Sequence, residues 1–290
     1  MPTLIDLRRR IRSVQNSQKI TQAMKTVSTA KFRKAQRAVF ASRPFWHIFP
    51  DLMNRLAYWA CDCWHPLLDV REEKRVEVLV VTSDKGLAGA FNSNLLERAA
   101  AFVAEKEKAA SVRLVLVGKK AVNFFRKGSR PVDRAFGDRT DRLPREEVRD
   151  LAEFLMRQYA LQRIDSVYIV FNEFKSILAP RMMTVRLLPL ASAPGSEPSA
   201  DWAPDWEPEV ERLVRYLLPL YVESQIHHAL HESQAAEQAA RMMAMDNASK
   251  NAEELVASYI LVLNKIRQAG ITKELLEIMT AVEALKSERE

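Results

Sequence analysis

Glycine is scarce in this sequence, with seven residues in 290, where average usage would give about twenty. Two segments, residues 3–43 and 220–269, contain neither glycine nor proline. An interior glycine costs a helix about 1 kcal/mol and a proline about 3 kcal/mol, so these segments are predicted to be uninterrupted helices. At about 1.5 Å per residue they would extend roughly 60 and 75 Å. Helices of that length cannot fold back within a compact domain and are expected to protrude.

Cysteine and long apolar runs are also lacking. The two cysteines, Cys61 and Cys63, exclude a disulfide framework and fit a reducing compartment. No run of eighteen apolar residues occurs, so no membrane-spanning helix is predicted. The first residues lack the apolar core and cleavage site of a secretory signal.

Acidic residues are almost absent from the first helix. Residues 1–43 hold eleven Lys and Arg against one acid, Asp6, whereas residues 220–290 carry a net charge of −4. The basic pI of 9.4 therefore comes from one terminal segment. Opposite charge on the two long helices favours their lying against each other.

Apolar spacing supports this pairing. Leu4, Leu7, Ile11 and Val14 follow a 3–4 rhythm typical of a coiled-coil seam. The seam is expected to continue, after a small break in register, through Ile20, Met24 and Val27. On the C-terminal helix the expected seam is rich in alanine and comprises Ala229, Ala236, Ala240, Met243, Asn247, Leu255, Tyr259, Val262 and Ile266. An antiparallel pair of terminal helices is predicted.

The middle of the chain has a different pattern. Strands are predicted at residues 76–83, 112–118, 165–174 and 181–190, and helices at 94–110, 120–128 and 145–162. Strands alternating with helices indicate an α/β layer with a mostly parallel sheet. Residues 191–209 contain four prolines and are expected to form an irregular connector, and the last helix is expected to begin or bend at Pro219.

The predicted fold is therefore α/β. A long antiparallel coiled coil of the N- and C-terminal helices accompanies a central Rossmann-like α/β domain. Its segments are an N-terminal shaft region at residues 1–65, the central domain at 75–190, the connector at 191–209 and a C-terminal shaft helix at 210–290.

The most enzyme-like feature is the strand-to-helix turn at residues 82–94, with sequence TSDKGLAGAFNSN. Backbone N–H groups and Lys85 would serve a phosphate there. The turn matches neither GxxxxGK[ST] nor GxGxxG, so a tight turn using glycine for backbone freedom is the favoured interpretation.

No metal site is predicted. Cys61, Cys63 and His65 lie close in sequence, but residues two apart on a helix point in nearly opposite directions. His227 and His231 would share a helix face, with His228 beside them, yet no third ligand is evident. No Ser/His/Asp or Cys/His constellation follows from the spacing, and no cofactor is predicted.

The net charge of +10 over the first 43 residues is strong enough for nucleic-acid binding. Against this, the segment has only two aromatic residues for stacking, Phe32 and Phe40, and one side is an apolar seam. Docking on an acidic protein surface explains the charge equally well. A basic coiled-coil nucleic-acid-binding protein remains the alternative.

Three blocks resemble the γ subunit of F-type ATP synthases. The first is IRSVQNSQKITQAMKTVSTAKFRKAQ at 11–36, followed by SRPF at 42–45, and the second is the turn at 82–94. The third comprises YVESQIHHALHESQAAEQAARMMAMDNASKNA at 221–252 and LNKIRQAGITKELLEIMTAVEAL at 263–285. The blocks occupy both ends and the centre, so the resemblance covers essentially the whole chain.

The resemblance implies a non-catalytic rotor shaft. In that family the paired terminal helices run up the axis of a ring of α and β subunits, where ATP is made or hydrolysed. The central domain sits beside the ε subunit on the membrane-embedded c-ring, whose proton-driven rotation the shaft transmits. It implies no cofactor, no nucleic-acid partner and no membrane span of its own. Since the family pattern begins almost at Met1, no presequence is expected, which favours the cytoplasmic face of a bacterial plasma membrane.

The resemblance also implies the residues that contact the α/β ring. Basic residues of the first helix would face acidic β segments, other positions would form a polar latch against β, and the last turns would sit in an apolar collar. Carried over to this sequence, these residues are Lys19, Met24, Lys25, Lys31, Arg241, Arg267, Gln268, Thr272, Ile278, Met279, Val282 and Leu285.

Overall fold

The computed structural model describes residues 4–59, 65–128, 130–137, 144–176, 181–190, 207 and 209–287. Within these ranges, the side chains at positions 42, 44–48, 50–59, 210 and 281–287 lie outside the description. The predicted connector at 191–209, apart from positions 207 and 209, and both cysteines fall outside the described residues. The chain divides into two compact units, Met1–Val27 with Met242–Glu290, and Ser28–Arg241.

The second unit contains a five-stranded sheet in the order β3-β2-β1-β4-β5. β1 (Arg75–Val81), β2 (Ser111–Val117), β3 (Val132–Phe136) and β4 (Ser166–Glu173) are parallel, and β5 (Arg181–Leu188) is antiparallel to β4. The four predicted strands and the mostly parallel sheet are confirmed. The sequence did not predict β3, because this edge strand is largely exposed and lacks a continuous apolar run.

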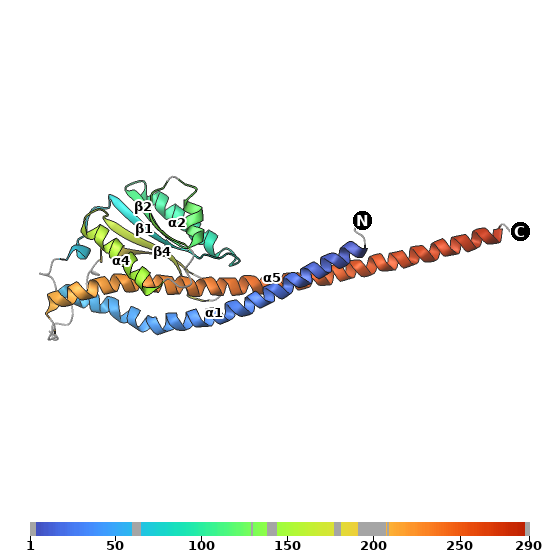
Figure 1. Cartoon of the computed structure of the whole chain (residues 1–290), viewed down its shortest axis with the longest axis horizontal. Coiled ribbons are helices and arrows are strands. Elements are labelled where there is room, and N and C mark those ends of the chain that lie inside the picture. The colour runs from blue at the N-terminus through green and yellow to red at the C-terminus, as the bar shows by residue number, and fades with distance from the viewer. Residues whose placement is uncertain are drawn as a thin grey trace. The chain divides into compact units, whose positions relative to one another are not determined.

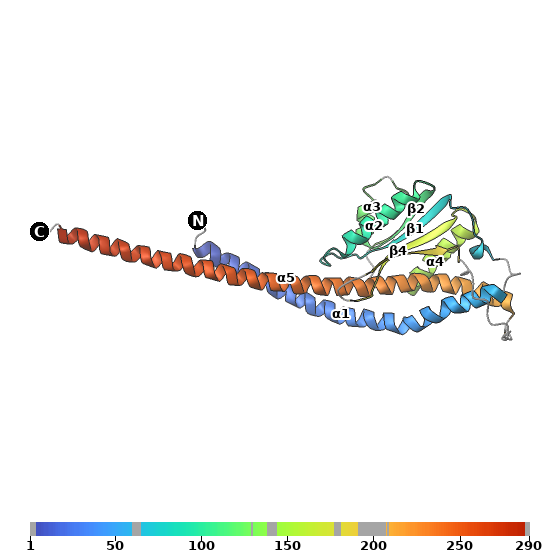
Figure 2. The ribbon, with the colours of Figure 1, turned by 180° about the vertical axis from the view of Figure 1, so that it is seen from behind.

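Helices cover both faces of the sheet (Figures 1 and 2). α2 (Phe91–Lys106) and α3 (Lys119–Phe125) pack on one face against alternate residues of β1 and β2. α4 (Arg145–Ala160) packs on the other face together with residues 214–229 of α5. A short 3-10 helix, η1 (Pro66–Leu68), contributes Leu67 to this second core. Because both faces are covered, β1 and β2 read as nearly continuous apolar runs.

The two terminal helices are longer than the breaker-free runs predict. α1 spans Leu4–Trp59 and α5 spans Val210–Ser287, with Pro219 inside α5 near its start. The helix therefore begins before Pro219, and one face of its first turns, with Val214 and Leu218, is buried in the core against α4. Among the described helices, none combines the length and the apolar character that crossing a membrane requires.

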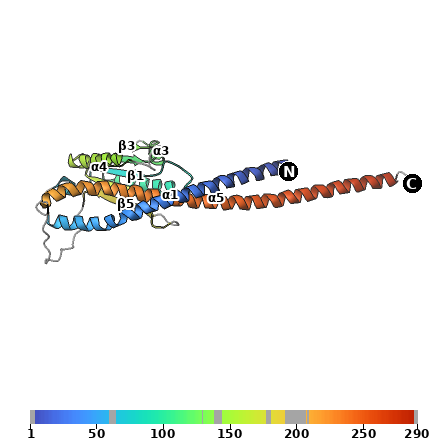
Figure 3. The same cartoon turned by 60° about the horizontal axis from the view of Figure 1, so that its bottom comes forward.

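Contacts within each unit establish that the terminal helices are antiparallel, as predicted. In the first unit, Thr21 contacts Ser249 and Lys25 contacts Asp246, and in the second, Arg43 contacts Glu232. Residue numbers on α5 thus fall as those on α1 rise. Figure 3 shows the two helices running side by side.

The seam of α1 differs from the predicted one after Val14. One set of buried or half-buried positions follows an unbroken heptad spacing of three and four residues: Leu4, Leu7, Ile11, Val14, Gln18, Thr21, Lys25, Ser28, Phe32, Ala35 and Val39. Met24, which the apolar pattern also placed in the seam, is half-buried beside this set. Ile20 and Val27, which the apolar pattern placed in the seam, are 60% and 56% exposed. The prediction was wrong because it followed apolar residues where the seam itself becomes polar.

The seam of α5 changes register in the same region. Ala229 and Ala236 are buried as predicted, but Asn247, Leu255 and Val262 are exposed. Ala240, Met243, Tyr259 and Ile266 are half-buried, as predicted. Further buried or half-buried positions, which the apolar pattern did not place in the seam, are Met245, Ser249, Ala252, Val256 and Leu263. The side-chain hydroxyls of Thr21 and Ser249 are 2.7 Å apart, and Lys25 Nζ lies 2.6 Å from Asp246 Oδ1. Polar pairing therefore replaces apolar packing in the middle of this coiled coil.

Candidate functional site

The carboxyl ends of β1 and β4 meet the two terminal helices within the second unit. An apolar cluster joins side chains of α1, α5, the turn after β1 and the end of β4. Its buried members are Phe32, Ala35, Val39, Ala88, Phe91, Phe174, Ala235, Ala236 and Ala239. The α5 side is made entirely of alanine, which permits close approach of the helix axis. This edge of an α/β sheet is where ligands or partners are commonly bound.

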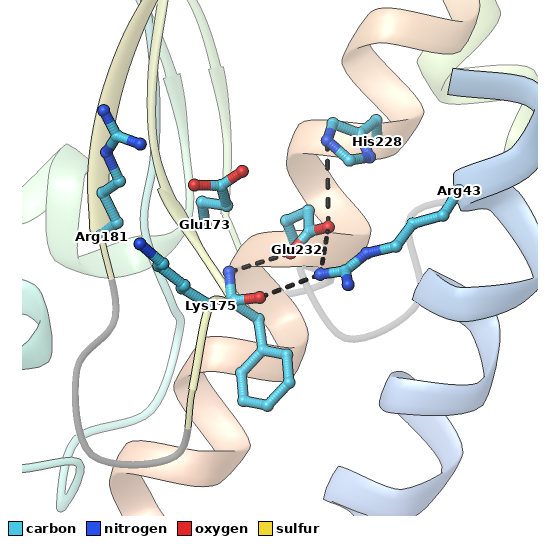
Figure 4. Close-up of a pocket in the computed structure, with 7 residues that line it drawn as sticks. Arg43, Glu173, Lys175, Arg181, His228 and Glu232 are labelled. Carbon is cyan, nitrogen blue, oxygen red and sulfur yellow. Dashed lines mark hydrogen bonds and ion pairs between the residues drawn. The ribbon is translucent and has the colours of Figure 1, made fainter. Parts of the chain in front are cut away.

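Phe174, directly after β4, contacts both helices through Arg43 and Glu232. Figure 4 labels these two partners. The Phe174 backbone N–H donates to Glu232 Oε2 of α5 at 2.8 Å, and its carbonyl accepts from Arg43 Nη2 of α1 at 3.1 Å. Arg43 Nη2 also lies 3.5 Å from Glu232 Oε1. The Phe174 ring packs edge-on against Phe32, with centroids 5.2 Å apart. The residue that follows β4 thus links α1 and α5.

Glu232 is a buried charged residue, with its side chain only 1% exposed. Burial raises its pKa, while the Phe174 N–H and the nearby Arg43 oppose that rise. A cavity of about 380 Å³ lies next to this carboxylate. Its lining consists of Arg43, Glu173, Phe174, Lys175, Arg181, His228 and Glu232. Among these residues, Glu232 already accepts a hydrogen bond from the Phe174 N–H and lies near the Arg43 guanidinium.

The turn at 82–94 is held by hydrogen bonds within itself and by hydrogen bonds from α5. The Asn92 side-chain carbonyl accepts from the Ser83 N–H at 3.2 Å and from the Ser83 hydroxyl at 3.0 Å. Arg241 of α5 donates to the Gly86 carbonyl at 3.2 Å and pairs with Glu237 at 2.6 Å. These contacts agree with a tight βα turn that is fixed to α5.

Leu87 at the tip of this turn is unusual. Its φ is +62°, a left-handed conformation that favours glycine, and its side chain is 62% exposed. For an L-residue this conformation costs about 1–2 kcal/mol. Backbone strain of this kind persists where surrounding contacts determine the conformation, here those of Arg241 and Asn92.

The histidines of α5 lie close together along the helix. The rings of His227 and His231 lie 6.1 Å apart, and burial lowers the pKa of both. Glu223 lies one turn from His227 and pairs with Arg145 of α4. Over the part of the chain that the structure describes, no three potential ligands converge on one point.

Glu77 on β1 carries the most perturbed carboxyl group. It is fully buried, and neither carboxylate oxygen has a hydrogen-bond partner within the described residues. Burial, together with the charge of Asp133, raises the pKa of Glu77 to about 7, and Arg113 opposes this rise. Glu77 does not line the cavity beside Glu232, and we expect it to affect the stability of the domain.

The predicted contact residues of α1 lie on different faces. Lys19 and Lys31 are exposed, and Met24 is half-buried beside the seam. Lys25 faces α5 and pairs with Asp246, whose pKa is held below its usual range by hydrogen bonds from Lys25 and Lys250. A partner carboxylate at Lys25 would therefore compete with Asp246.

The predicted residues of α5 separate into an internal anchor and an exposed segment. Arg241 is buried on the turn after β1, whereas Arg267, Gln268, Thr272, Ile278 and Met279 are exposed. Val282 and Leu285 lie on α5, but their side chains are outside the described residues. Residues 260–280 expose many large apolar side chains: Ile260, Leu261, Val262, Ile271, Leu275, Leu276, Ile278 and Met279. Exposed apolar surface on this scale marks an interaction surface.

Sequence reasoning missed Arg43, Phe174 and Glu232. Arg43 is one of eleven basic residues in its segment, and nothing in the pattern distinguishes it. Glu232 carried the one available signal, since it is an acid beside the predicted alanine seam. Its partners lie 58 and 189 positions away along the chain, so only the tertiary structure identifies them.

Comparisons with known proteins agree with this geometry. The family model described as ATP synthase matches residues 3–285. The ATP synthase gamma chain of Pelotomaculum thermopropionicum is 40% identical over 286 residues, covering 99% of this chain and 100% of that protein. That of Aquifex aeolicus is 40% identical over 285 residues, covering 98% of each.

Solved structures share the fold. A chain of the Euglena gracilis mitochondrial ATP synthase matches with a TM-score of 0.65 and 19% identity, covering 99% of this chain and 96% of that one. A central-stalk chain from Tetrahymena thermophila matches with a TM-score of 0.60 and 23% identity, covering 79% of this chain and 99% of that one. With paired terminal helices, a central α/β domain and relatives matched from end to end, this chain belongs to the ATP synthase gamma chain family.

Proposed function

We propose that this chain is the central rotor shaft of a proton-translocating F-type ATP synthase. As a gamma chain it is a non-catalytic subunit, and it couples rotation of the c-ring to the α/β ring that makes or hydrolyses ATP. Its partners are the α and β subunits, the ε subunit and the c-ring. The observation that supports this most directly is the long exposed stretch of α5 at residues 260–280, which carries apolar side chains suited to a surrounding ring of subunits.

Residues 1–65 and 210–290 would serve as the shaft, residues 75–190 as the domain beside ε and the c-ring, and residues 191–209 as a connector. Contacts with the α/β ring would involve Lys19, Met24 and Lys31 on α1. On α5 they would involve Arg267, Gln268 and Thr272 as a polar latch. Single surface ion pairs contribute about 0–1 kcal/mol to stability. Such weak contacts suit a surface whose contacts form and break in each rotation of the shaft.

The C-terminal end of α5 would rotate within an apolar collar formed by the surrounding subunits. Ile278 and Met279 are exposed there, and Val282 and Leu285 follow on the same helix. Apolar contacts are non-directional, so they hinder rotation little. This chain would lie peripherally at the cytoplasmic face of a bacterial plasma membrane.

Co-expression with the α and β subunits of the same source tests this function. We expect a complex with one copy of this chain per three α–β pairs that hydrolyses ATP. Replacing Arg267 and Gln268 by alanine is expected to lower turnover while the isolated chain keeps its helix content. A chain that stays apart from α and β, and binds DNA at physiological salt instead, would refute the proposal in favour of the nucleic-acid alternative.

A further inference from the structure

The second unit holds its helix pair by two kinds of contact. The apolar cluster presents a smooth alanine surface on α5 at Ala235, Ala236 and Ala239. Contacts of this kind resist separation, but they are non-directional and small side chains interlock little, so they resist sliding and twisting weakly. Residues 214–229 of α5 are packed into the core of the domain, but no described residue of α1 belongs to that core, so resistance to twisting where α1 meets the sheet edge must come from directional bonds.

Those directional bonds converge on Phe174. Its N–H donates to Glu232 of α5 and its carbonyl accepts from Arg43 of α1, so both hydrogen-bonding groups of one peptide position are engaged by different helices. Arg43 also pairs with Glu232, which closes a triangle between α1, α5 and the end of β4 (Figure 4). The Phe32 ring holds the Phe174 side chain from α1.

Burial makes this triangle rigid. Glu232 is 1% exposed, so moving α5 relative to β4 would strip a buried carboxylate of its donors, and an uncompensated buried charge is strongly unfavourable. Of its partners, the Phe174 N–H belongs to the backbone, which cannot follow the helix as a flexible side chain would.

A second attachment fixes α5 further along its axis. Arg241, nine residues after Glu232, donates to the carbonyls of Gly86 and Lys85. Nine residues span roughly 13 Å of helix. Glu232 and Arg241 thus attach α5 to the sheet edge at two positions along the helix axis. Together these directional bonds oppose both sliding and rotation of α5.

We infer that the Arg43–Glu232–Phe174 triangle is the joint through which torque passes between α1 and the α/β domain with its packed helix α5. This rests on the proposed rotor function and adds to it the positioning residues that make the joint stiff. They touch no nucleotide, and they act by keeping the angle between domain and helices fixed under load.

The test measures torsional stiffness in the assembled complex. A probe is attached to the central α/β domain of this chain through Lys127→Cys, at an exposed position, in a background with Cys61→Ser and Cys63→Ser. The ring of α and β subunits is fixed to a surface. Angular fluctuations are recorded for the parent chain, for Arg43→Gln and for the double variant Arg43→Gln with Glu232→Gln. We expect the variance of the angle to rise about twofold at an unchanged ATPase rate, because a charge-assisted bond from α1 and the ion pair are lost.

Glu211→Gln is the matched control, since it removes an ion pair with Arg215 that lies within α5 and bridges no elements. Its fluctuations should equal those of the parent. The double variant leaves no uncompensated charge, so it keeps the test valid if Arg43→Gln alone fails to fold. A variance for the double variant equal to that of the control would overturn the inference. Failure of the parent chain to assemble with α and β would instead count against the proposed function.

Discussion

Two residues of the α/β domain have environments that conflict with their chemistry. Glu77 is a carboxyl group inside the sheet, and Leu87 is a branched side chain in a left-handed conformation. Each conflict predicts a substitution that should stabilise the domain, which is uncommon, since most substitutions destabilise.

Glu77 makes the stability of the domain pH-dependent. Because burial raises its pKa to about 7, the folded chain keeps a proton that the unfolded chain releases near pH 4.5. The contribution of this group is therefore fully present below about pH 4.5 and is lost as the pH rises to about 7. Glu77→Gln, which cannot ionise, is expected to raise the free energy of unfolding by up to about 3 kcal/mol at pH 8, and by almost nothing at pH 4. Urea denaturation at both pH values measures this.

Glu107→Gln serves as the comparison for Glu77. Hydrogen bonding to Arg130 lowers the pKa of Glu107, so its ionised form is the stabilising one. This variant should lose a little stability at pH 8 instead of gaining it. If Glu77→Gln also loses stability at pH 8, the carboxyl has a partner that the environment described above does not include.

Leu87→Gly is expected to stabilise the chain by about 1 kcal/mol, because it removes the cost of a left-handed conformation while giving up little buried surface. Thermal unfolding would show a higher midpoint. Leu161 offers a control of similar exposure with φ −79°, so Leu161→Gly relieves no strain and should not stabilise. Equal effects at both positions would contradict the argument from backbone strain.

At the scale of elements, the coiled-coil seam is the feature that the structure redefines. Along α1 the seam positions keep a 3–4 spacing through Gln18, Thr21 and Lys25, while apolar Ile20 and Val27 face outward. Polar seam residues specify register at some expense of stability, because only one alignment pairs them. The Thr21–Ser249 and Lys25–Asp246 pairs supply that alignment here.

The register of α1 can be tested by substitution in the isolated chain. Ile20→Ser and Val27→Ser should each change the free energy of unfolding by no more than about 0.5 kcal/mol, as expected of exposed positions. Leu7→Ala, at a buried seam position that is 3% exposed, should cost about 2–3 kcal/mol. Chemical denaturation followed by circular dichroism compares them. The reverse order of effects would restore the seam that the apolar pattern predicts.

The hydroxyl pair can be tested separately. Thr21→Val should cost about 1 kcal/mol by leaving Ser249, which is 7% exposed, without its partner. Adding Ser249→Ala should recover most of that loss, because replacing both partners by apolar groups is nearly neutral. A double-mutant cycle measures the coupling. Additive effects would mean that the two hydroxyls do not interact.

For the whole molecule, residues 260–280 of α5 represent surface that contributes little to the stability of the isolated chain. Ile278→Ser with Met279→Ser should therefore leave its melting temperature unchanged, since both side chains are more than 60% exposed. Association with the α/β ring should weaken at least tenfold, because burying each such side chain is worth about 1.5–3 kcal/mol. Titration of labelled chain into α and β subunits measures the affinity. An unchanged affinity would show that the ring does not enclose this part of α5.

Much of the architecture follows from the sequence itself. Scarce glycine and the absence of proline from two segments determined the long helices, and β-branched runs determined four strands, because these properties act locally along the chain. The opposite charges of the terminal segments indicated their pairing. The family resemblance then supplied the function that spacing and composition left open.

Only the tertiary structure determined which positions face inward where the local pattern is ambiguous. Ile20 and Val27 are exposed while Thr21 and Lys25 are half-buried, because the partner helix offers Ser249 and Asp246 in this stretch. Likewise, Glu232 contacts Phe174, which is 58 residues away along the chain, and Arg43, which is 189 residues away. The physical reason is that burial and pairing of polar groups depend on contacts between distant segments. Helix and strand formation, in contrast, depends largely on neighbours in the chain.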